Sequence, residues 1–101
     1  MEIKIIGDNV EITEAMDNYI KSKFLNLPLP NKLQSVEFRV NVLKNIQTVS
    51  FSSHFNNKDH FIENKGSTFY EATDVLLDKI KREFVKNKEQ SHKKASKLNW
   101  N

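Results

Sequence analysis

The chain has 101 residues, of which 38% are apolar and 29% charged, so it suits one globular domain and leaves little room for two. It contains no cysteine, which excludes a disulfide scaffold, a thiolate metal site and a cysteine nucleophile. The net charge of +3 is unevenly placed, because residues 79–101 hold 8 of the 16 basic residues, an asymmetry typical of a polyanion-binding end.

A strand followed by a helix is predicted for the first part of the chain. Apolar and polar residues alternate over residues 1–5, as in a half-buried strand, and Gly7 ends this run. Thr13 is a good N-cap for a helix, and Pro28 ends that helix because its ring prevents continuation. The apolar face of this helix comprises Met16, Ile20, Phe24 and Leu27.

Three strands joined by two short turns are predicted next. Apolar and polar residues alternate clearly over residues 36–42 and 48–55, and a shorter strand covers residues 59–64. Lys44-Asn45 is a plausible first turn. Asn56-Asn57 supplies the second turn, because asparagine tolerates left-handed backbone.

A long helix is predicted for the last third of the chain. Thr68 and Glu71 fit a capping box, in which each side chain accepts a hydrogen bond from the other residue's backbone N–H. The apolar period fades after Val85, so we expect one domain over residues 1–90 and a basic, flexible tail over residues 91–101. The apolar stripe of the helix comprises Phe69, Thr73, Leu76, Leu77, Ile80 and Phe84.

This order of elements, β-α-β-β-β-α, predicts an α+β fold. The first two strands are joined through a helix and can therefore lie parallel in a right-handed βαβ unit. The last three strands are joined by short turns and form an antiparallel meander. One face of the sheet must then carry both helices, which gives a two-layer sandwich.

A row of cations runs along the second helix. At about 100° per residue, four of these cations fall within an arc of roughly 60° that lies away from the apolar stripe. Such a row suits a polyphosphate backbone, whereas the alternative is a solvated helix face with ion pairs such as Asp78–Arg82. The uneven charge favours nucleic acid. The four residues of the arc are Lys79, Arg82, Lys86 and Lys93. Lys81 and Lys88 lie on the far flank of the helix, and Lys94 and Lys97 continue the charge into the tail.

Other candidate sites carry weaker signals. His54 and His60 could approach across a hairpin and bind a metal, but no third ligand supports such a site. Asp74 and Asp78 could share a cation, although ordinary helix-surface charges are the favoured interpretation. Trp100 could stack on a base, but a disordered end is favoured. Neither a Gly-rich phosphate loop nor a catalytic motif occurs, so we expect no enzyme activity, no metal and no cofactor.

Two parts of the sequence carry a resemblance to a known family. IGDNVEITEAM at residues 6–16 with KFLNL at 23–27, and FYEATDVLLDKI at 69–80, resemble the bacterial ribosome hibernation promoting factor family, in its short form. The resemblance extends from residue 1 to about residue 94 and implies a β-α-β-β-β-α fold similar to a double-stranded-RNA-binding domain. Thr73 is a departure, because an aliphatic residue is usual there.

The resemblance also implies a function. It implies a non-enzymatic cytoplasmic protein of stationary phase and stress, monomeric when free, that binds the small ribosomal subunit and its rRNA. In the decoding channel it would block the binding of mRNA and tRNA and so inhibit translation. Whether it also promotes inactive ribosome dimers is left open by the sequence. The rRNA phosphates would be contacted by Lys23 and by six cations of the second helix: Lys79, Arg82, Lys86, Lys88, Lys93 and Lys94. No membrane and no small-molecule substrate is expected. The alternative is a generic double-stranded-RNA-binding domain without preference for ribosomes.

Overall fold

Four strands and two helices follow one another in the expected order. This computed structural model describes the backbone of residues 1–96 and the side chains of residues 1–85. No helix within that part of the chain is long and apolar enough to cross a bilayer. The elements are β1 (Glu2–Gly7), α1 (Glu14–Leu25), β2 (Ser35–Leu43), β3 (Ile46–Phe55), β4 (Lys58–Gly66) and α2 (Phe69–Ser96).

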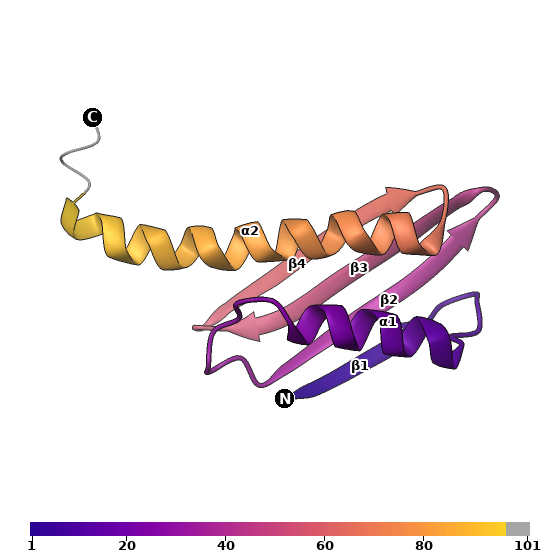
Figure 1. Cartoon of the computed structure of the whole chain (residues 1–101), viewed down its shortest axis with the longest axis horizontal. Coiled ribbons are helices and arrows are strands. Elements are labelled where there is room, and N and C mark those ends of the chain that lie inside the picture. Colours follow the sequence, from indigo (N-terminus) through magenta and orange to yellow (C-terminus); the bar gives the residue numbers. More distant parts are fainter. Residues whose placement is uncertain (97–101) are drawn as a thin grey trace.

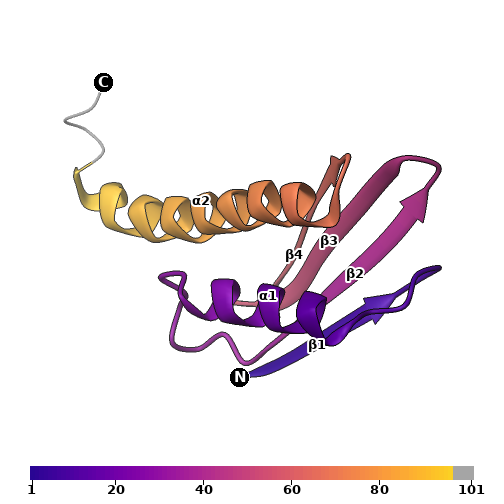
Figure 2. The same ribbon diagram turned by 45° about the vertical axis from the view of Figure 1, so that its right-hand side comes forward.

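The strands form a single sheet with the order β1-β2-β3-β4. β1 lies parallel to β2, with Ile3 opposite Val36, while β2, β3 and β4 pair antiparallel. Figures 1 and 2 show α1 and α2 side by side on one face of the sheet, and the described residues leave the other face uncovered. The predicted α+β two-layer sandwich is confirmed.

The core lies between the two helices and the sheet. Phe24 of α1 packs on Phe38 of β2 and Phe51 of β3, with ring centroids 5.3 and 5.7 Å away. Phe84 of α2 meets Phe51 edge-on at 6.2 Å. The predicted apolar stripe of α2 is buried along its whole length. Thr73 belongs to it with no exposed surface, and its hydroxyl has no hydrogen-bond partner among the described residues.

The ends of β1 and α1 have local causes. A Cβ at Gly7 would lie 1.9 Å from the carbonyl oxygen of Val10, so only glycine allows the chain to turn there. The Thr13 hydroxyl accepts a hydrogen bond of 3.1 Å from the backbone N–H of Met16, which confirms the predicted N-cap. α1 ends at Leu25, slightly before the end indicated by the apolar spacing.

The β3–β4 turn fixes the register of the hairpin. Asn56 and Asn57 have φ angles of 57° and 59°, the left-handed backbone expected of asparagine in a tight turn. This turn places His54 opposite Asp59, and the nitrogen and oxygen atoms of these side chains lie 2.7 Å apart.

The start of α2 differs in detail from the predicted capping box. The Thr68 hydroxyl accepts a 3.1 Å hydrogen bond from the Glu71 N–H, as expected. The Glu71 carboxylate instead reaches Ser67, where it accepts from the backbone N–H at 2.9 Å and from the hydroxyl at 3.0 Å. Both hydrogen bonds lower the pKa of Glu71 from its usual value, and the bond from the backbone N–H of Ser67 has the larger effect. At its other end α2 continues to Ser96, so residues 91–96 are helical, while the flexibility of the tail stays a prediction.

Candidate nucleic-acid interface

The first two cations of the predicted row lie on the exposed side of α2. Lys79 and Arg82 are exposed, whereas Ile80 between them is fully buried. The Lys79 ammonium donates a 3.3 Å hydrogen bond to the backbone carbonyl of Glu63 on β4. Arg82 forms an ion pair with Asp78 one turn earlier, and 75% of its side chain remains accessible. Both cations are available at the surface, and their contact with RNA stays a prediction.

The rest of the predicted row continues along the same helix. Lys86, Lys88, Lys93 and Lys94 belong to α2 by their backbone, while their side chains lie outside the described residues. Trp100 also lies outside them. We call the five residues Lys79, Arg82, Lys86, Lys93 and Lys94 the basic face, because at about 100° per residue they share one side of α2, whereas Lys88 falls on the opposite flank.

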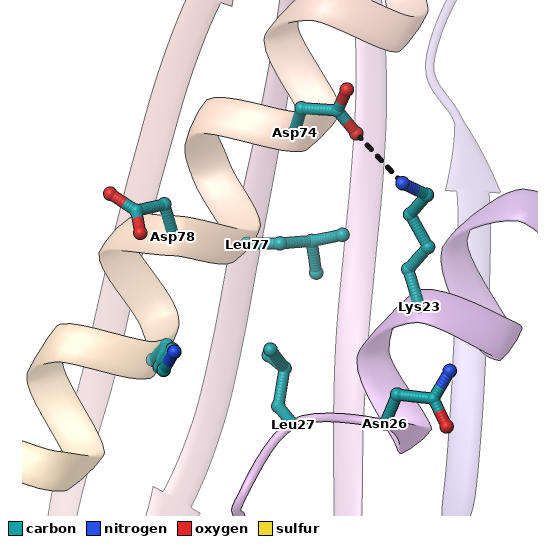
Figure 3. A pocket seen from close by; sticks show the side chains of 7 residues that line it. Lys23, Asn26, Leu27, Asp74, Leu77 and Asp78 are labelled. Carbon is teal, nitrogen blue, oxygen red and sulfur yellow. Dashed lines mark ion pairs between the residues drawn. The ribbon is translucent and has the colours of Figure 1, made fainter.

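Lys23 is placed on a different surface from the basic face. Figure 3 shows its side chain reaching from α1 towards Asp74 of α2, where ammonium and carboxylate are 3.8 Å apart. The ammonium also lies 5.0 Å from the centre of the Tyr19 ring. The Tyr19 hydroxyl donates a 2.6 Å hydrogen bond to the same carboxylate, and this bond raises the pKa of Tyr19. Asp74 therefore joins the two helices.

A groove lies between α1 and α2. Leu27 and Leu77 project into it between the helices, and polar side chains surround them (Figure 3). Its volume is about 470 Å³. The residues that line it are Lys23, Asn26, Leu27, Asp74, Leu77, Asp78 and Lys81. Sequence reasoning did not predict this groove, although Asp74, Leu77 and Lys81 recur at helical spacing and so belong to one flank of α2.

The histidine pair and the aspartate pair do not form a shared metal site. His54 is 64% exposed and faces Asp59, whereas His60 is only 4% exposed and points to the helical side, 3.4 Å from a Glu83 oxygen. His60 lies opposite Ser53, the residue before His54 on β3. Because successive side chains of a strand point to opposite faces, the two imidazole rings lie on opposite sides of the sheet. Asp74 and Asp78 each pair with their own cation. Among the described residues, no group of three potential ligands could hold a metal ion.

Comparison with known proteins supports the resemblance. The family model described as "Sigma 54 modulation protein / S30EA ribosomal protein" matches residues 3–92. The chain belongs to this family. A relative within it, the Ribosome hibernation promoting factor of Escherichia coli K12, is 32% identical over 91 residues, which cover 89% of this chain and 96% of that protein. The factor of Azotobacter vinelandii is 26% identical, covering 89% of this chain and 85% of that protein.

Solved structures show the same fold. A ribosomal subunit interface protein from Coxiella burnetii superposes with a TM-score of 0.82 at 18% identity, covering 88% of this chain and 99% of that one. The N-terminal domain of Thermus thermophilus Protein Y gives a TM-score of 0.74 at 21% identity, with coverages of 83% and 96%. The expected family and fold are thus confirmed.

Proposed function

We propose that this protein is a ribosome hibernation factor that binds the small ribosomal subunit in the decoding channel and inhibits translation by excluding mRNA and tRNA. The observation that carries the proposal is the family match over residues 3–92, which includes most of the basic face. Ribosomes are cytoplasmic, so the protein acts there. Inhibition occurs by occupancy, with no substrate turned over.

The basic face is suited to rRNA phosphates. Phosphate contacts by lysine and arginine release counterions and need no base sequence. The ion pair of Arg82 with Asp78 is exposed, and such pairs contribute only about 0–1 kcal/mol, so a phosphate can displace the carboxylate. Lys79 uses one N–H on the Glu63 carbonyl and keeps its other donors for a ligand.

The test compares two double charge reversals with the same net change. Lys79→Glu with Arg82→Glu removes two cations from the basic face, while Lys4→Glu with Lys65→Glu alters exposed residues of β1 and β4. Co-sedimentation with purified small subunits is measured over a series of salt concentrations. We expect the first variant to lose at least about tenfold in affinity and about two units of the salt slope, and the control to bind like the wild type.

Three outcomes contradict the proposal. Equal binding by the folded Lys79→Glu/Arg82→Glu variant removes the role of the basic face. Equal competition by free duplex RNA favours the generic double-stranded-RNA-binding alternative. Inhibition of translation by catalytic amounts, in place of a plateau at an equimolar ratio, excludes occupancy as the mechanism. A sucrose-gradient profile of ribosomes with and without the protein then distinguishes silencing of single ribosomes from pairing of ribosomes.

A further inference from the structure

An exposed aromatic side chain lies beside the α1–α2 groove. Tyr70, in the first turn of α2, has 46% of its surface exposed. Two rings hold it in place by edge contacts: Tyr19 at 4.7 Å with an interplanar angle of 84°, and Phe69 at 5.2 Å with an angle of 80°. An exposed ring that is already fixed loses little conformational entropy when a flat ligand stacks on it.

Tyr70 belongs to the flank of α2 that lines the groove. At about 100° per residue, Tyr70, Asp74 and Lys81 fall within an arc of roughly 40°. Lys79 lies on the opposite flank, where it contacts β4. At 1.5 Å per residue, the distance along α2 from Tyr70 to Lys81 is roughly 16 Å, enough for a few nucleotides of an extended strand. The flank therefore forms a surface separate from the basic face.

Two ammonium groups along this flank are placed to receive the phosphates of an anionic strand. The lining of the groove holds two lysines and two aspartates; Asp74 is held by Lys23 and by the Tyr19 hydroxyl, and Asp78 pairs with Arg82 on the other side of the groove rim. Half of the Lys23 side chain is exposed, at 49%, and its ion pair is long at 3.8 Å. Lys81 is exposed, and no carboxylate within residues 1–85 pairs with it. Lys81 is thus a cation without a carboxylate partner in the described part of the chain, and Lys23 can exchange its exposed ion pair with Asp74 for a phosphate.

We propose that the α1–α2 groove binds a short unpaired segment of RNA, with a base stacked on Tyr70 and phosphates against Lys23 and Lys81. The inference rests on the proposed function and adds a second contact surface to it. It also specifies the class of RNA, because a base inside a duplex is stacked on its neighbours and cannot reach a protein ring. Stacking on an aromatic side chain accepts any base, so this site recognises unpaired structure more than sequence.

The experiment measures affinity for the small subunit together with base-specific chemical probing of the rRNA in each complex. Tyr70→Ala is expected to weaken binding about 5- to 100-fold and to restore reactivity at unpaired bases that the wild type protects. Tyr70→Phe keeps the ring and should recover the affinity that the alanine variant loses. Phe61→Ala is the matched control, because Phe61 is an exposed aromatic, at 66%, on the sheet face away from the helices.

The outcomes separate this inference from the proposed function. A folded Tyr70→Ala variant with wild-type affinity and protection overturns the inference and leaves ribosome binding intact. Equal losses in Tyr70→Phe and Tyr70→Ala also overturn it, since the hydroxyl would then be the contact. A photo-cross-link from position 70 to a ribosomal protein shows a protein occupant and overturns it as well.

Two further measurements keep the inference testable. If Tyr70→Ala does not fold, the Lys81→Gln variant tests the proposal instead, because Lys81 is exposed and its substitution should leave folding intact. A lower affinity for the small subunit with a salt slope reduced by about one unit supports the proposal. An unchanged affinity overturns it. If the wild type does not bind subunits, the proposed function fails. Binding of a mixed-sequence unpaired oligonucleotide then tests the groove separately, with Tyr70 dependence supporting the inference and its lack overturning it.

Discussion

Phe84 should be one of the most sensitive positions for folding. Its side chain is only 3% exposed and contacts the rings of Phe51, Phe55 and His60, with centroids 5.4 to 6.2 Å away. Phe84→Ala removes a complete buried ring and leaves a cavity between α2 and the sheet, so it should cost about 3–5 kcal/mol of unfolding free energy. A domain of this size shifts its melting temperature by about 4–8 °C per kcal/mol, so the variant should melt at least about 12 °C below the wild type.

Thermal and urea unfolding followed by circular dichroism measure this difference. The control is Arg82→Gln, because the Arg82 side chain is 75% exposed and its substitution should change stability by less than about 0.5 kcal/mol. If Phe84→Ala melts with the wild type, the helix does not pack on the sheet in the register described. The outward orientation of Lys79 and Arg82 then fails with it.

Two further predictions concern α2. Thr73→Val replaces a buried hydroxyl by a methyl group of similar size, and that hydroxyl has no hydrogen-bond partner in the described part of the chain. The unfolding free energy measured in urea should therefore rise by about 1 kcal/mol. A lower unfolding free energy would show that the hydroxyl is hydrogen-bonded. Glu71 has a lowered pKa in the folded state, so its contribution is present above the unfolded-state pKa and is lost as pH falls through the folded-state value. Glu71→Gln should therefore lower the melting temperature at pH 7. The difference in melting temperature from the wild type should narrow below about pH 4. A difference that does not change with pH would show that the charge of Glu71 is not what stabilises the protein.

The sheet and the register of α2 were predictable because each depends on one local period. Alternation over residues 36–42 gave the inward positions of β2, and the 3.6-residue period placed Phe69 to Phe84 on one buried stripe. The asparagine turn followed from the backbone preference of a single residue type. Patterns of this kind need no knowledge of what lies opposite an element.

Features that depend on two elements could not be predicted in this way. The ion pair of Lys23 with Asp74 and the groove beside it require the separation of α1 and α2, which packing of both helices on the sheet decides. The placement of His54 and His60 on opposite faces did have a signal. A two-residue turn at Asn56-Asn57 pairs position 54 with 59, so His54 faces Asp59. No sequence signal indicated that the Glu71 carboxylate would accept from the Ser67 N–H, because the Thr68 N–H was an equivalent donor.

α2 continues well beyond the part of it that packs on the sheet. The helix has 28 residues, and its last described buried side chain is Phe84, so residues 85–96 extend roughly 18 Å from the anchored half, past the sheet in Figure 1. A tilt of about 5° at the anchor would move the far end by about 1.5 Å, enough to misalign a charged side chain with a phosphate. The position of the helix end that carries the distal lysines is therefore set by core packing between α2 and the sheet, several turns away.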